Sequence, residues 1–368
     1  MSAIRPLERE DLPEVVRLYE QIMRDGEPAP HLVGFFERTL LDHPWADPEI
    51  PSLVYQEDGQ ILGFIASSVR RMRFEGRLIR LGCSGHLLSR ADARTRGIGA
   101  LLLRAYLAGP QDLTISDGST ETVRRIWQGL GGDTVYLGCL SYIQVFRPWR
   151  LAADYLFGRP GLTPLQTIVG PISSGLDAVA RLVTGHMLRP VQPDGEVEPL
   201  TPAAMLEHLP QLTASLRLVP AYDDEYLRWL FEELAQVARR GPLWTAGEGR
   251  RHVARGALWA ELVRQGDRVI GWYVCHLRRG GFCRVLQVAA GPRDSETVFG
   301  HLAYRARERG AAGLYGRLEP GVFGPVSNGR SLLRVHEGRM LAHSREQAIL
   351  DSIYTGDSLL TRLDGEWW

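Results

Sequence analysis

The sequence contains no lysine, so arginine alone supplies its positive charge. Lys plus Arg total 43 and Asp plus Glu total 43, which gives a formal net charge of zero. A chain without a net positive field has no global attraction for nucleic acid or for an anionic membrane surface. We therefore expect no nucleic-acid partner.

Cysteine is scarce and scattered. Cys83, Cys139, Cys275 and Cys283 form no C-x-x-C pair. This argues against a zinc site and against a disulfide framework, and it is typical of a reducing compartment. The charged N-terminus has no apolar run of the kind that a secretory signal needs. The sequence therefore predicts a cytoplasmic protein without a metal.

No uncharged run is long enough to span a membrane. The segment Pro160–Leu176 carries no charge, but it is shorter than a membrane-spanning helix and is broken by Pro164, Gly170, Pro171 and Gly175. We interpret it as a linker helix, buried or lying on the surface, and we expect no membrane span.

Two short patterns recur in the same order along the 368 residues. Ile4–Glu8 leads into an amphipathic helix, and Val197–Thr201 does the same much later. A hairpin pattern then follows in each case, over Leu53–Phe64 and over Leu262–Trp272. Two matches in register indicate that one mixed α/β unit is duplicated.

This repeat sets the expected domain boundaries. We place one domain at residues 1–150, a linker-helix region rich in Pro and Gly at 151–194, and a second domain at 195–368. In the first domain we expect the last strand over Thr134–Phe146.

The strongest local signal is the run Arg94-Thr95-Arg96-Gly97-Ile98-Gly99-Ala100, which joins a strand to an apolar helix. Backbone N–H groups at a helix N-terminus bind anions, and glycines let a phosphate approach the main chain. Leu102 stands where a dinucleotide fingerprint needs its third glycine, and the Walker A lysine is absent. Without further context, a capping turn with two solvated arginines explains the run as well as a diphosphate site does.

The context favours the diphosphate site. The run resembles the pyrophosphate loop of the GNAT (Gcn5-related N-acetyltransferase) superfamily, [Q/R]-x-x-G-x-[G/A], with Arg94, Gly97 and Gly99 at the patterned positions. The resemblance covers residues 3–148 well and 195–368 in outline only. It implies an α/β fold of two tandem GNAT-like mixed-sheet domains, with acetyl-CoA or another acyl-CoA as co-substrate.

The resemblance also implies where that co-substrate binds. The strand before the loop would part from its neighbour, and its main chain near residues 87–89 would pair with the pantetheine amides. The expected cofactor-binding residues are Leu87, Leu88, Ser89, Arg94, Thr95, Arg96, Gly97, Ile98, Gly99, Ala100 and Trp127.

Two departures from the family pattern stand out. Trp127 occupies the position where the family commonly has a tyrosine that protonates the leaving thiolate, and an indole N–H does not release a proton near pH 7. Either another group serves as the acid or the thiolate leaves unaided. In the second copy the loop position reads Gly291–Glu296, with two carboxylates and no paired glycines. We expect that copy not to bind CoA in the usual way.

His86 and Asp117 are the candidate catalytic residues, because acyl transfer needs a base that deprotonates the amine. His86 lies near the end of the strand that enters the loop, although a core histidine is the simpler interpretation. Asp117 closes the next strand beside the expected pantetheine gap, although it also fits a turn before the following helix.

The leading hypothesis is an acyl-CoA-dependent N-acyltransferase that acts on a small amine by direct transfer, as a monomer or homodimer. One alternative is a non-catalytic acyl-CoA-binding or regulatory protein that lost the chemistry. The other is an aminoacyl-tRNA-dependent transferase, against which the balanced charge counts.

Overall fold

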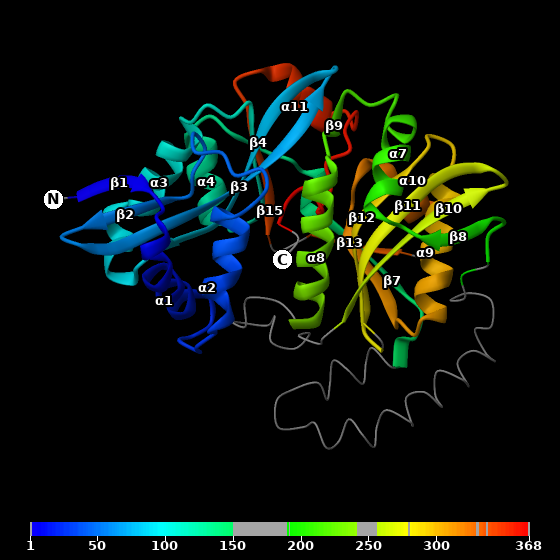
Figure 1. Ribbon diagram of the computed structural model, residues 1–368, viewed down its shortest axis with the longest axis horizontal. Coiled ribbons are helices and arrows are strands. Elements are labelled where there is room, and N and C mark those ends of the chain that lie inside the picture. Colours follow the sequence, from blue (N-terminus) through cyan, green and yellow to red (C-terminus); the bar gives the residue numbers. More distant parts are fainter. Residues whose placement is uncertain are drawn as a thin grey trace.

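The computed structural model describes residues 2–149, 190, 192–240, 256–278, 280–328, 331–335 and 338–366, with the backbone alone at 93–95 and 240. Two mixed sheets lie side by side, with helices packed on their faces (Figure 1). Most of the linker region expected at 151–194, including Pro160–Leu176, lies outside the described residues.

The first sheet has the strand order β1-β2-β3-β4-β5-β15-β6, with β9 along part of β3. Its strands are β1 (Ser2–Pro6), β2 (Leu53–Glu57), β3 (Gln60–Phe74), β4 (Arg77–Ser89), β5 (Leu113–Ser119), β6 (Asp133–Thr134), β9 (Leu218–Pro220) and β15 (Arg339–His343).

The second sheet has the order β14-β7-β13-β12-β11-β10-β8. Its strands are β7 (Leu140–Val145), β8 (Glu196–Pro199), β10 (Ala257–Gln265), β11 (Arg268–Leu277), β12 (Phe282–Ala290), β13 (Gly313–Arg317) and β14 (Ser331–Val335). The two hairpins predicted from the repeat are therefore β2–β3 and β10–β11.

The helices follow the apolar periodicity of the sequence. They are α1 (Leu12–Met23), α2 (His31–Phe36), α3 (Ile98–Leu107), α4 (Glu121–Gly129), α7 (Pro202–Leu212), α8 (Asp224–Arg240), α9 (Ser295–Glu308), α10 (Phe323–Asn328) and α11 (Gln347–Tyr354). In α1, for example, Leu12, Val15, Val16 and Tyr19 are buried on one face.

Each sheet contains at least one strand from the other half of the chain: the first sheet contains β9 and β15, and the second contains β7. β15 pairs with β5, and β7 pairs with β13. The single strand expected over Thr134–Phe146 is thus corrected to β6, a 3-10 turn at Leu137–Cys139 and then β7, which belongs to the second sheet. An alternating pattern specifies which face of a strand is buried but not which sheet the strand joins. The sequence around β7 therefore did not indicate that β7 pairs with the second sheet.

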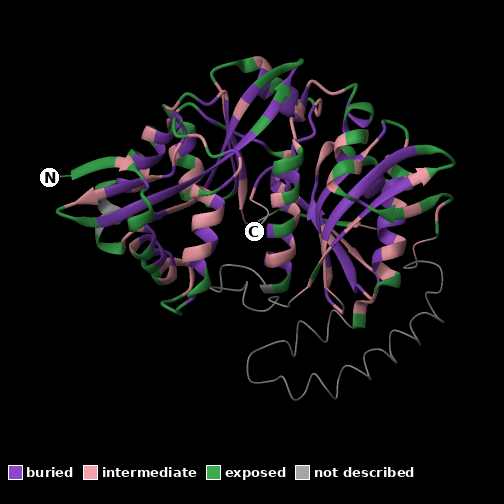
Figure 2. Ribbon diagram, in the orientation of Figure 1, coloured by how far each residue is buried: buried purple, intermediate pink, exposed green. Residues whose placement is uncertain are grey.

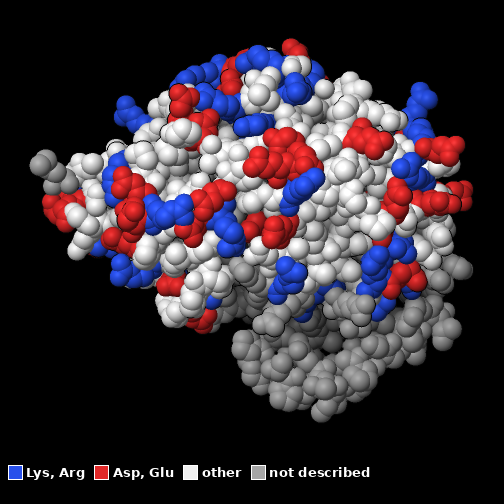
Figure 3. All heavy atoms as spheres, in the orientation of Figure 1, with Lys and Arg blue, Asp and Glu red and all other residues white. Residues whose placement is uncertain are grey.

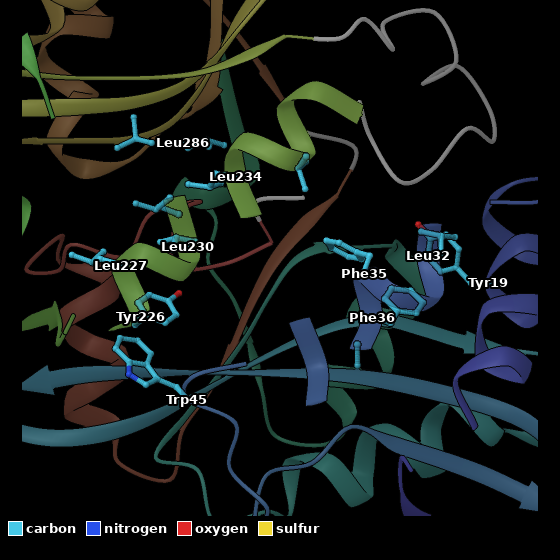
Figure 4. Close-up of a cluster of buried hydrophobic side chains, with 14 of the residues drawn as sticks. Tyr19, Leu32, Phe35, Phe36, Trp45, Tyr226, Leu227, Leu230, Leu234 and Leu286 are labelled. Atoms are coloured by element: carbon cyan, nitrogen blue, oxygen red, sulfur yellow. The ribbon is translucent and has the colours of Figure 1, made fainter. Parts of the chain in front are cut away.

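One of the hydrophobic core clusters spans both halves. Figure 2 shows the central strands of both sheets largely buried, and helices buried on one side only. One apolar cluster includes Tyr19 and Phe36 of the first half together with Tyr226 and Leu286 of the second. Trp45 stacks on Tyr226 with ring centroids 3.6 Å apart, and Figure 4 shows the pair at the end of α8. The two sheets therefore pack against each other and are not independent domains joined only by a linker.

The outer surface carries both signs of charge. On the face in Figure 3, acidic and basic side chains are interspersed rather than sorted into patches. Among the described residues, no helix is both long and apolar enough to cross a membrane.

Candidate functional site

The strands β4 and β5 part after a short parallel ladder. They pair only from Leu81 to Cys83, opposite Leu113 to Ile115, although β4 continues to Ser89 and β5 to Ser119. The hydroxyl of Ser84 donates to the carbonyl of Ile115 over 3.2 Å, just where the strands separate. The result is a wedge-shaped gap between two strand ends, as the resemblance implied.

A bulge shapes the β4 side of this gap. Phe64 of β3 pairs with Leu88 and Ala66 pairs with Gly85, so His86 and Leu87 together face Ile65 alone. His86 adopts a φ of 47°, in the left-handed region that a side chain seldom enters. The bulge turns the main chain at residues 86–87 away from a regular ladder.

The N-terminus of α3 lies beside the bulge and is open. Gly97 is the exposed N-cap residue with φ 72°, and a Cβ atom built on it would meet nothing within 4 Å. At Gly99 the same atom would meet only Leu87, at 3.9 Å. A phosphate can therefore approach these main-chain N–H groups, and the site passes a first test of fit for a CoA diphosphate.

The charged side chains of the loop are only partly described. The guanidinium of Arg96 donates to Glu57 over 2.6 Å, and both groups reach solvent. The side chains of Arg94 and Thr95 lie outside the described residues. A hollow of about 440 Å³ opens next to the loop, between α1 and residues 90–92.

Trp127 does not line the gap. Its side chain is fully buried in the core between α3, α4 and the sheet, and its indole N–H donates to the carbonyl of Ala342 on β15 over 3.0 Å. This position therefore serves packing in the structure, and the indole is not free to meet a leaving thiolate.

Asp117 is held in a buried ion pair. Its carboxylate accepts from the guanidinium of Arg317 on β13, and from the backbone N–H of Glu366 over 3.1 Å. Burial alone would raise the pKa of Asp117, but the positive charges of Arg317 and Arg362 outweigh it and hold the pKa below its ordinary value. A carboxylate with so low a pKa is a weak base. The ion pair between Asp117 and Arg317 instead links the two halves of the chain.

His86 is enclosed by aromatic rings. Its ring lies 5.1 Å from that of Tyr19 and 5.6 Å from that of Phe36, centroid to centroid. Burial lowers the pKa of His86 to about 4, so the imidazole is neutral at pH 7. A group with so low a pKa accepts a proton reluctantly near neutrality.

The structure adds Glu366, which the sequence did not single out. This carboxylate lies at the end of β5, where it accepts from the hydroxyl of Ser116 over 3.4 Å. Burial, and then the charge of Asp117, raises the pKa of Glu366 to about 7. A Cβ built on Gly118 of β5 would lie 3.0 Å from this carboxylate, which places Glu366 against the end of that strand.

The second copy repeats the parting of strands but not the open loop. β12 and β13 pair only from Phe282 to Arg284 and then separate. At the following helix N-terminus the carboxylate of Asp294 takes the anion position, 2.6 Å from where a Cβ on Gly291 would lie. Arg268 binds that carboxylate through two contacts of 2.7 and 3.0 Å. An internal anion thus occupies the place that a phosphate would need.

The C-terminal segment crosses the wedge of the second copy. The N–H of Leu363 donates to the carbonyl of Leu286, at the bulge of β12, over 3.1 Å. Arg317, the last residue of β13, donates to the carbonyl of Leu360 over 3.0 Å. The same segment then brings Glu366 to the first gap, where its N–H donates to Asp117 over 3.1 Å. Among the described residues, no three His, Cys, Asp or Glu side chains gather as a metal site requires.

Comparison with known proteins identifies the fold. No protein-family model matches the sequence, and no curated protein matches it either. The structure is similar to a probable N-acyltransferase, a conserved protein of unknown function from Enterococcus faecalis, with a TM-score of 0.57 and 11% identity over 96% of this chain and 75% of that one. It is also similar to a GCN5-related N-acetyltransferase from Kribbella flavida, with a TM-score of 0.52 and 14% identity over 93% of this chain and 70% of that one. The chain has the GNAT fold, and the fold prediction from the sequence is confirmed.

Proposed function

We propose that the chain is an acyl-CoA-dependent N-acyltransferase that uses the first copy to bind acetyl-CoA or another acyl-CoA. The observation that supports this most is the separation of β4 from β5 beyond Cys83, next to the unobstructed N-terminus of α3. Residues 87–89 would hold the pantetheine through the main chain, and residues 94–100 would hold the diphosphate. The co-substrate supplies an acyl group activated as a thioester.

The acceptor is a small amine that attacks directly, and Glu366 is the proton acceptor. As the amine nitrogen bonds to the acyl carbon, its proton passes to the Glu366 carboxylate and the carbon–sulfur bond breaks with the electron pair on sulfur. Glu366 suits this role better than His86 or Asp117, because its pKa of about 7 matches the working pH. His86 then serves to shape the bulge of β4 and does not take part in proton transfer.

Binding of the co-substrate is tested by thermal shift. Acetyl-CoA or a longer acyl-CoA at 100 times its dissociation constant should stabilise the protein by about 2.7 kcal/mol. Gly99→Val should abolish this shift, because a branched side chain fills the approach to the main chain. Ser295→Val, at the N-terminus of α9, is the matched control and should leave the shift intact. A normal shift in Gly99→Val, or none in the wild type with any acyl-CoA, would refute the proposed site.

A non-catalytic acyl-CoA-binding protein is the second candidate. It is favoured by Trp127, which replaces the common acid and is committed to the carbonyl of Ala342. A broad panel of amines separates the two candidates: binding of acyl-CoA without acyl transfer to any amine supports the binding protein. The mixed charges of the face in Figure 3 offer no support for an aminoacyl-tRNA substrate.

A further inference from the structure

Arg284 lies where β12 and β13 separate in the second copy, and its charge has no ion-pair partner among the described residues. It is the last residue of the β12–β13 ladder, opposite Tyr315. Its neighbours Cys283 and Val285 both pack in the core between β12 and α9, so the side chain of Arg284 lies on the opposite face of β12. Among the described residues the guanidinium has no hydrogen bond and no ion pair, and the side chain is part-exposed. A solute can therefore reach it.

A second arginine, Arg362, lies near Arg284, because the N–H of the next residue, Leu363, donates to the carbonyl of Leu286 over 3.1 Å. Arg362 donates through Nη2 to the carbonyl of Glu366 over 3.3 Å, and its buried Nε has no hydrogen-bond partner among the described residues. Burial, and then the charge of Arg362, lowers the pKa of Arg284 to about 9. The remaining groups that act on Arg284 are Tyr315, Asp117 and Glu366.

The nearby carboxylates compensate these two cations only in part. Asp117 is paired with Arg317, and Glu366 has a pKa of about 7, so it is only partly ionised at neutral pH. Two close guanidinium groups with unused donors cost folding free energy. A small anion between them would remove that cost, because guanidinium donors match carboxylate and phosphate oxygens.

We propose that Arg284 and Arg362 bind an anionic group of the acceptor, a carboxylate or a phosphate, and so place its amine at Glu366. This inference rests on the proposed function, since it locates the acceptor of that reaction. Arg362 and Glu366 belong to one short segment, so a compact molecule reaches from the anion site to the proton acceptor. The second copy thereby supplies the acceptor site for co-substrate bound in the first.

Matched pairs of small amines test the charge requirement. Isothermal titration in the presence of CoA would compare glycine with glycinamide, leucine with leucinamide, and O-phosphoethanolamine with ethanolamine. We expect the anionic member of at least one pair to bind and its neutral partner to bind at least tenfold more weakly. The pair that responds distinguishes a carboxylate from a phosphate. Equal binding within every pair, or no binding by any anionic amine, would overturn the proposal.

Variants of Arg284 test the residue itself. Arg284→Gln should weaken the anionic amine by about tenfold to a hundredfold, the usual effect of a charge-assisted hydrogen bond, and should leave the neutral partner unchanged. Arg264→Gln is the control: it makes the same change on the same sheet, but at an exposed pair with Glu198. Arg284→Met should also raise the melting temperature of the ligand-free protein, because it removes a half-buried cation that has no ion pair among the described residues and lies near a second cation.

The outcomes separate this inference from the proposed function. If acyl-CoA still shifts the melting temperature of Arg284→Gln but the anionic amine binds it like wild type, the acceptor site is wrong and the cofactor site stands. If Arg284→Met lowers the melting temperature by several degrees, the guanidinium is already compensated within the protein and the proposal fails on that ground.

Discussion

Asp117→Asn is expected to lower the free energy of unfolding by about 3–5 kcal/mol, because it removes the fully ionised partner of the buried Arg317. The carboxylate that remains beside Arg317 is Glu319, at 3.2 Å, and burial raises its pKa to about 7. The side chains of Asp117 and Arg317 are 0% and 3% exposed, so water does not screen the loss. Asparagine fills the same space, so no cavity adds to the cost, and its amide oxygen still accepts from the N–H of Glu366. Equilibrium urea unfolding followed by fluorescence measures the difference.

Two further variants test the reasoning. The double variant Asp117→Asn/Arg317→Met should recover much of the loss, since the buried cation is gone and Glu319, whose pKa burial raises to about 7, can take up a proton. Glu49→Gln, which breaks an exposed pair with Arg80, should cost less than about 1 kcal/mol. If Asp117→Asn costs as little as Glu49→Gln and yet abolishes turnover, Asp117 is the proton acceptor and its structural role assigned here is wrong.

Two other predictions concern Trp127 and Glu366. Gly132→Ala should destabilise by about 1–3 kcal/mol in a urea melt, because the new Cβ would lie 2.0 Å from the indole nitrogen of Trp127. The control Gly129→Ala meets no atom within 4 Å and should be neutral or stabilising; equal losses would show that the packing around Trp127 is misread. For Glu366, whose pKa is raised to about 7, the ionised form is the base, so kcat should rise as pH increases through about 7. Glu366→Gln should lower kcat by about 10²–10⁴-fold and abolish this limb, with acyl-CoA binding retained; an unchanged pH profile would remove Glu366 from the chemistry.

The local elements of the fold were predictable because the sequence encodes them over a few residues. The glycines at 97 and 99 follow a strand and precede an apolar run, and the structure has β4, the left-handed turn at Gly97 and α3 in that order. Thr201, expected near a helix start, caps α7 by accepting from the N–H of Ala204. Both features depend only on neighbours in sequence.

Only the co-substrate side of the candidate site was predictable from the sequence. The position of the gap followed from the resemblance, but the roles of the polar residues depend on contacts across the whole chain. Asp117 meets Arg317 and Glu366, which lie about 200 and 250 residues further on. A carboxylate near the C-terminus carries no local pattern that distinguishes it from a solvated one. For the same reason, nothing in the sequence indicated that Arg284 would lie near Arg362.

The duplicated fold explains why the two copies differ in what fills their wedges. A pair of parting parallel strands exposes main-chain groups that need partners. In the second copy the chain itself satisfies them, through Leu363 on β12 and Asp294 at the helix N-terminus. In the first copy the corresponding loop stays open at Gly97, and the proposed occupant is a separate molecule. The C-terminal segment fills the gap of the second copy and ends at the gap of the first. The second copy therefore fixes the position of Glu366. Any change that separates Leu363 from β12 also displaces the proposed proton acceptor.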